Sequence, residues 1–133
     1  MTIVGLPDAA VRESAERVSS AVSASALPKD DGTITVNLAP ADLKKEGPSF
    51  DLPIALAVVA CAEGVDLKGA GDCQIIGELA LDGSVRPVKG ILAAAIEAKM
   101  RGRKRLLVPL ESATKNAPAI PGALVVRTFD GHI

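Results

Sequence analysis

The sequence predicts a two-layer α/β domain in which helices pack against a mixed β-sheet. Short apolar or alternating segments, typical of strands, are separated by longer segments with helical periodicity. The dipeptide Asp82-Gly83 joins two strand-like segments and predicts a tight hairpin. The predicted order of elements is β-α-β-α-β-β-α-β-α-β, and the 133 residues are enough for one domain with a single core.

The first part of the chain predicts a strand, a helix and a second strand. Residues 2–6 form a short apolar strand, and Pro7 and Asp8 then open a helix that runs to about residue 26. Residues 33–38 alternate between polar and apolar side chains, as a half-buried strand does. The apolar stripe predicted for the helix consists of Val11, Ala15, Val18 and Val22.

A charged loop, residues 43–48, leads into the most apolar segment of the chain, residues 54–62. Pro53 has no N–H group and fits only in the first turn of a helix, so the helix should begin near Ser49. Gly64 is suited to end it. Because apolar residues fall on every face of this helix, we expect it to be buried on all sides.

The second half of the chain predicts a strand over residues 74–81, then the hairpin, and then a third helix over residues 89–101 that ends at Gly102. The inner face predicted for this helix consists of Leu92, Ala95, Ile96 and Met100. The other predicted elements are the return strand 84–86, a buried strand 106–108, a short helix 111–116 and a last strand 123–126.

The composition argues against several classes of function. The net charge is -1, so the molecule as a whole does not attract nucleic acid or a membrane surface. The longest apolar run is too short to span a bilayer. Cys61 and Cys73 are expected to be buried or incidental thiols of a cytoplasmic protein. The sequence contains no Cys/His cluster, so we expect no metal site.

Ser49 lies where the charged loop meets the apolar helix, and it has two interpretations. Serine is among the best N-cap residues, because its hydroxyl accepts a hydrogen bond from the first turn of a helix. Asp51 in that turn would suit the positive end of the helix dipole. Alternatively, a hydroxyl at a helix start is exposed and can act as a nucleophile. Residue type and position alone favour the cap.

The residues Glu46-Gly47-Pro48-Ser49 resemble the Asp-Gly-Pro-Ser string that carries the nucleophile of Lon-type Ser–Lys proteases. Longer strings are similar to Mg-chelatase-like AAA+ ATPases of the ComM and YifB type, and they cover residues 3–14, 34–42, 47–56 and 77–83. The resemblance implies a Lon-protease-like domain, within the ribosomal-protein second-domain-like fold, over residues 1–133. It also implies that this domain is truncated at its amino terminus and is followed in the parent protein by an AAA+ module.

In Lon-type proteases a lysine on the helix after the hairpin takes the proton from the serine. The matching stretch here is residues 87–92, and the resemblance places the lysine position on Leu92. Leucine cannot act as a base, and we expect it to be buried. Lys89 either is a solvated surface lysine or swings toward Ser49. The resemblance therefore implies that Ser49 is a vestigial nucleophile position.

Basic residues gather in a dense cluster after the third predicted helix and in a smaller one in the charged loop. They are either solvated ends of elements or contacts for the phosphate backbone of DNA. Because Phe50 and Phe129 are the only aromatic residues, stacking of bases on the protein is not expected. The candidates for DNA contact are Arg101, Arg103, Lys104, Arg105, Lys44 and Lys45.

The resemblance implies a non-catalytic accessory domain of an AAA+ ATPase, a hexameric branch-migration helicase that remodels DNA in natural transformation. The expected partners are the AAA+ module of the parent, neighbouring subunits and DNA of any sequence. The chain has no P-loop string, so ATP and Mg are expected only in the AAA+ module and no cofactor in this chain. The alternatives are a Ser–Lys peptidase that uses Ser49 and a purely structural protein-interaction module.

Overall fold

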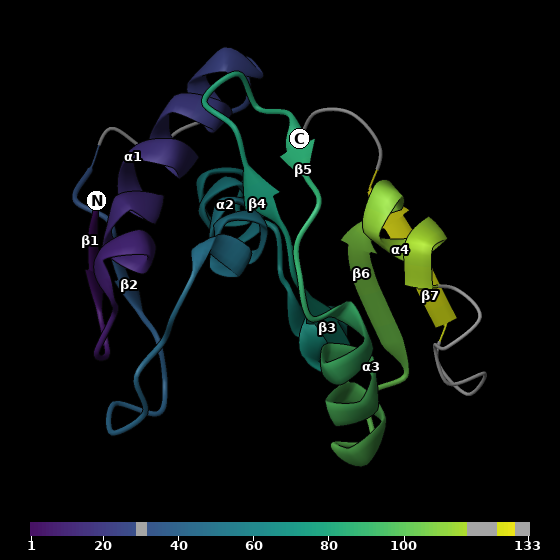
Figure 1. Cartoon of the computed structure of the whole chain (residues 1–133). Coiled ribbons are helices and arrows are strands. Elements are labelled where there is room, and N and C mark those ends of the chain that lie inside the picture. The colour runs from purple at the N-terminus through teal and green to yellow at the C-terminus, as the bar shows by residue number, and fades with distance from the viewer. Residues whose placement is uncertain (29–31, 117–124, 130–133) are drawn as a thin grey trace.

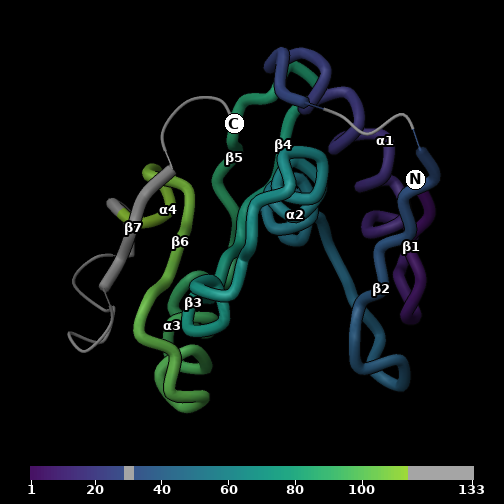
Figure 2. Tube along the Cα trace, turned by 180° about the vertical axis from the view of Figure 1, so that it is seen from behind, coloured from purple at the N-terminus to yellow at the C-terminus, as the bar shows by residue number. Residues whose placement is uncertain are grey.

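The computed structural model describes residues 1–28, 32–116 and 125–129. It confirms the α/β class, because helices alternate with short strands along the chain. Figures 1 and 2 show the elements before residue 40 on one side of helix α2 (Asp51–Ala62) and those after residue 90 on the other side. The elements between them therefore connect two groups that lie apart in space.

The first group is a βαβ unit made of β1 (Thr2–Val4), α1 (Ala9–Ala24) and β2 (Thr35–Asn37). The two strands pair in parallel, with Ile3 opposite Val36. All three elements were predicted at these places, although both strands are shorter than predicted. The crossover helix α1 covers the pair, as a parallel connection requires.

Helix α1 begins where the sequence predicts because Asp8 caps it. The Asp8 Oδ1 accepts a hydrogen bond from the backbone N of Val11 at 2.8 Å. Three residues of the predicted stripe face the core, since Val11, Val18 and Val22 are at most 1% exposed, while the fourth, Ala15, is only partly buried. Ser14, a polar residue, is buried among them with 0% exposure. This face of the helix therefore contains a buried hydroxyl group as well as apolar side chains.

Helix α2 follows a 3-10 turn, η1 (Pro48–Phe50), and supplies most of the first core. Two of its residues, Ala57 and Cys61, are exposed, so the expectation that α2 is buried on every side was wrong for this strip. Its neighbours cover only part of its circumference. The core cluster shared with α1 contains Leu52, Ile54, Ala55, Val58, Val18, Ala21 and Val22.

The second group contains a parallel sheet in the order β3-β6-β7. A second 3-10 turn, η2 (Lys68–Asp72), leads into β3 (Cys73–Ile75), and β6 (Arg105–Pro109) forms the central strand. Helix α4 (Leu110–Asn116) connects β6 to β7 (Val125–Phe129). The predicted last strand 123–126 is shifted toward the C-terminus, and its first two residues lie outside the described residues.

The strand predicted over residues 74–81 is interrupted at Gly77. The backbone N of Gly77 donates to the carbonyl of Ser49 at 3.0 Å, and its carbonyl accepts from the backbone N of Leu52 at 3.0 Å. A Cβ at this position would lie 2.8 Å from Cδ2 of Leu52. The strand therefore breaks because its backbone pairs with the start of α2 instead of a neighbouring strand, and only glycine fits that approach.

Beyond the break, β4 (Glu78–Leu79) pairs antiparallel with β5 (Val85–Arg86), which confirms the predicted hairpin. Asp82 accepts a hydrogen bond from the backbone N of Ser84 at 2.9 Å and stabilises the turn. In place of one mixed sheet, the described strands form three small sheets: β1-β2, β3-β6-β7 and β4-β5.

Helix α3 (Ile91–Met100) packs on β6 through a face other than the predicted one. Of the predicted inner residues only Ala95 is buried, while Leu92, Ile96 and Met100 are 38%, 47% and 83% exposed. Apolar side chains occur all around α3, so periodicity alone did not determine which face is inside. The second core cluster contains Ile91, Ala95, Ala98, Leu106, Val108 and Ala113.

One carboxylate joins the elements of the first core. Asp51, the first residue of α2, is 0% exposed. Arg17 from α1 donates to its Oδ2 from Nε at 2.6 Å and to its Oδ1 from Nη2 at 3.0 Å. The Ser14 hydroxyl also donates to Oδ1, and the backbone N of Leu79 donates to Oδ2 at 3.2 Å. Asp51 thus links α2 to both α1 and β4.

We expect Asp51→Asn to lower the free energy of unfolding by about 3 kcal/mol, because it leaves the Arg17 guanidinium without its main buried partner. Glu13→Gln is the matched control. It removes an exposed carboxylate whose Oε2 lies 3.6 Å from Nη1 of Arg17. Because the Glu13 side chain is 71% exposed, the loss should be no more than about 0.5 kcal/mol. Urea unfolding of both variants measures the difference, and equal midpoints would contradict a structural role for Asp51.

Candidate functional site

Ser49 is not the N-cap that the sequence predicts. It lies in the middle of η1, whose N-cap is Gly47, while α2 has Phe50 as its N-cap. At neither helix start does a backbone N–H donate to the side chain of the N-cap residue. The free N–H of Leu52 is satisfied by the carbonyl of Gly77 instead. A backbone contact from a distant loop has therefore replaced the cap.

The loop before Ser49 is held by a side chain from α1. Asp8 Oδ2 accepts a hydrogen bond from the backbone N of Gly47 at 3.1 Å, while its Oδ1 caps α1. The hydrogen bond from the N–H of Val11, with that from Gly47 and nearby cations, lowers the pKa of Asp8 below its ordinary value. One ionised carboxylate thus fixes both the helix start and the loop.

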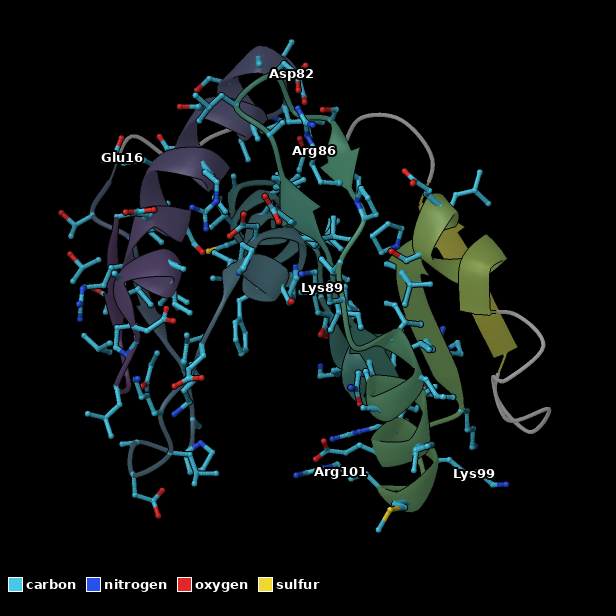
Figure 3. The ribbon with its side chains drawn as sticks, in the orientation of Figure 1. Glu16, Asp82, Arg86, Lys89, Lys99 and Arg101 are labelled. Carbon is cyan, nitrogen blue, oxygen red and sulfur yellow. The ribbon has the colours of Figure 1, made fainter. Side chains whose placement is uncertain are left out.

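Leu92, where the resemblance to Lon-type proteases places the base, lies in the first turn of α3. It is 38% exposed, so the expectation that it is buried was wrong. Its aliphatic side chain cannot accept a proton. Lys89 is exposed and lies in the segment between β5 and α3 (Figure 3). Of the two interpretations made for Lys89, exposure favours the solvated lysine.

The two basic clusters, far apart in the sequence, border the same open cavity of about 610 Å³. The charged loop contributes Lys44, and the C-terminal end of α3 and the residues after it contribute Arg101 and Arg103. Arg101 and Lys99 extend to opposite sides of α3 (Figure 3), and only Arg101 lines this cavity. The remaining lining residues include Pro40, Leu43, Lys45, Glu46, Phe50, Cys73, Gln74, Ile75 and Glu97.

Two of the cations at the cavity, Lys44 and Arg101, are held only by exposed ion pairs. Lys44 pairs with Glu46 at 2.9 Å and Arg101 pairs with Glu97 at 2.7 Å, with all four side chains at least 56% exposed. The hydrogen bond to Glu46 raises the pKa of Lys44 above its ordinary value. Exposed ion pairs contribute little stability and exchange partners easily, so both cations can turn to an anionic ligand.

Three of the basic residues predicted from the sequence, Lys45, Arg103 and Arg105, donate from their side chains to structural partners. Lys45 is 7% exposed and its Nζ donates to the carbonyl of Pro40, so we do not count it among surface contacts. Arg105 donates from Nε to Asp72 at 2.9 Å and also to the carbonyl of Gly69, which holds η2 against β6. The hydrogen bond from Arg105 lowers the pKa of the Asp72 carboxyl. The sequence pattern gave no sign of these contacts.

Lys104 is exposed, and its backbone N donates to the carbonyl of Asp72 at 2.9 Å. Arg103 donates from Nη1 to the carbonyl of Gly71. Within residues 1–28, 32–116 and 125–129, no group of three or more His, Cys, Asp or Glu side chains could hold a metal ion. No helix in this described part of the chain has the length and apolar character needed to cross a membrane.

Ser49→Ala should change the free energy of unfolding by less than about 0.5 kcal/mol, because its hydroxyl caps neither η1 nor α2. Ser14→Ala is the comparison. It removes a buried hydroxyl that donates to Asp51 and should cost about 1 to 3 kcal/mol. Urea unfolding measures the stability of both variants. If Ser49→Ala lowers the free energy of unfolding as much as Ser14→Ala does, the N-cap interpretation of Ser49 is supported.

A family model described as subunit ChlI of Mg-chelatase matches residues 1–112. The protein YifB of Escherichia coli is 45% identical over 104 residues, which are 78% of this chain and 21% of YifB. Competence protein ComM of Haemophilus influenzae is 39% identical over 114 residues, 86% of this chain and 22% of ComM. The peroxisomal Lon protease homolog 2 of Caenorhabditis elegans is 31% identical over 80 residues, 60% of this chain and 10% of that protein. The chain spans 21–22% of the length of its two nearer relatives named here.

Proposed function

The chain belongs to the family of subunit ChlI of Mg-chelatase, and from this premise we propose that it is a non-catalytic accessory domain of an AAA+ ATPase. Leu92 carries the proposal. Together with the similarity to a Lon protease homolog, a leucine at the position of the proton acceptor favours a protease-like scaffold without peptidase chemistry. The whole chain then forms one domain of the parent protein.

The parent that we propose is a hexameric DNA-remodelling helicase of the ComM type, located in the cytoplasm. The similarity to a competence protein over 86% of this chain supports it. ATP and Mg would bind to an AAA+ module elsewhere in the parent, because this sequence has no P-loop string. Within that parent the domain would contact the AAA+ module, neighbouring subunits and DNA.

The proposed DNA contact is the cavity bordered by Lys44, Arg101 and Arg103. Clustered cations on two elements can neutralise several phosphates and release their counterions, whatever the base sequence. The net charge of the chain is -1, so the attraction must come from this local cluster. One domain would bind weakly, and a ring of copies would gain affinity through multivalency.

A structural interaction module is the second candidate, and the exposed face of α3 favours it. Ala93, Ile96 and Met100 line a shallow, mostly apolar cavity of about 550 Å³, which Glu97 and Arg101 also border. Exposed apolar patches of this kind often mark protein interfaces. This function is compatible with the first, because a domain that helps assemble a ring needs such a surface.

The chain should have no peptidase activity. We expect neither cleavage of unfolded casein nor labelling by a serine-reactive fluorophosphonate, because the Ser49 hydroxyl lacks an activating base at position 92. The Ser49→Ala variant is the control for labelling at other serines. If the unmodified chain is labelled and the Ser49→Ala variant is not, the result would favour the peptidase alternative instead.

We expect weak, salt-sensitive binding of DNA that depends on the cavity cations. Arg101→Ala/Arg103→Ala should weaken binding equally for unrelated DNA sequences and flatten the slope of log affinity against log salt by about 2. Lys99→Ala/Lys68→Ala removes the same charge at two residues that do not line the cavity and is the matched control. Fluorescence anisotropy with labelled oligonucleotides measures both, and equal losses would place binding outside the cavity.

A further inference from the structure

The cavity with the basic rim also contains an aromatic side chain. Phe50, the last residue of η1, lines it together with Lys44 and Arg101. Phe50 is half-buried and packs against the core cluster of α1 and α2. One part of the ring is therefore fixed by the core while the residue still borders the open space.

The backbone on both sides of Phe50 is held in place. The carbonyl of Ser49 accepts from Gly77, and the backbone N of Asp51 donates to the carbonyl of Pro48. The Asp51 side chain is in turn bound by Arg17 and other donors. Phe50 is thus a rigid element, which lowers the entropic cost of packing a ligand against it.

We propose that this cavity binds single-stranded DNA, with one unpaired base stacked on Phe50 and adjacent phosphates contacted by Lys44, Arg101 and Arg103. An aromatic platform beside a positive rim is the arrangement that binds single strands without sequence preference. Gln74 also lines the cavity and can donate to or accept from a base edge. This inference rests on the proposed DNA contact and specifies which form of DNA it takes.

The cavity selects against duplex DNA for a geometric reason. In a duplex both faces of each base are covered by neighbouring bases, so a base reaches an aromatic side chain only when it is unpaired or flipped out. The volume of about 610 Å³ lies in the range of ordinary ligand pockets. The low aromatic content argued against stacking at the sequence level, but one well-placed ring is enough for one base.

The test compares labelled oligo(dT) with a duplex of the same length by fluorescence anisotropy. Oligo(dT) should bind more tightly than the duplex. Phe50→Leu should weaken oligo(dT) binding by at least about fivefold, the lower end of the effect of removing one stacking platform, and leave duplex binding unchanged. Phe50→Trp keeps an aromatic platform and should retain oligo(dT) binding.

Phe50→Trp also provides a direct signal. The chain has no Trp and no Tyr, so the new indole would be the only strong intrinsic fluorophore, and stacking of a base should quench it saturably. This readout decides the question if Phe50→Leu does not fold. Absence of quenching, or an unchanged affinity of a folded Phe50→Leu for oligo(dT), overturns the inference. Salt-sensitive binding of both DNA forms would then still support the DNA contact, whereas binding of neither form overturns both proposals.

Discussion

The buried carboxylate of Asp51 is the interaction on which the arrangement of the first core depends. A charge with 0% exposure is tolerable only when several donors surround it, and here they come from α1 and from β4. Because Arg17 binds both oxygens, it holds the start of α2 against α1. That position in turn orients η1, and with it Ser49 and Phe50. The network thus couples the packing of the domain to the segment that carries its candidate functional residues.

The cavity with the basic rim depends on a second set of contacts to the start of α2, made by Gly77. Gly77 pairs through its backbone with Ser49 and Leu52, so the break between β3 and β4 is attached to the start of α2. The parallel sheet that begins at β3 is therefore held beside the charged loop. Arg105 fixes η2 to this sheet through Asp72. These contacts bring two basic segments, separated by more than fifty residues in the sequence, to one open surface.

A scaffold related to proteases does not by itself imply proteolysis, because function resides in the site and not in the fold. Here the serine remains near the start of the buried helix, but the structure assigns that stretch a positional role. Its carbonyl binds Gly77 while its hydroxyl caps neither η1 nor α2. The proposed site lies beside it, at Phe50 and the basic rim. The network that fixes the backbone around Ser49 also holds Phe50, the platform of the proposed site, in place.

Local sequence patterns predict the order of the elements, except that one predicted strand is divided into β3 and β4, and they predict the Asp8 start of α1 and the Asp82-Gly83 hairpin. These features depend on neighbours within one turn or one hairpin, or on residue identity alone. The sequence pattern does not predict the partners of Asp51, the burial of Lys45, the break at Gly77 or the face of α3 that packs on β6. The physical reason is that each of these depends on contacts between segments distant in the chain. A helix that is apolar all around, such as α3, can bury any of its faces, and only the shape of its neighbours selects one.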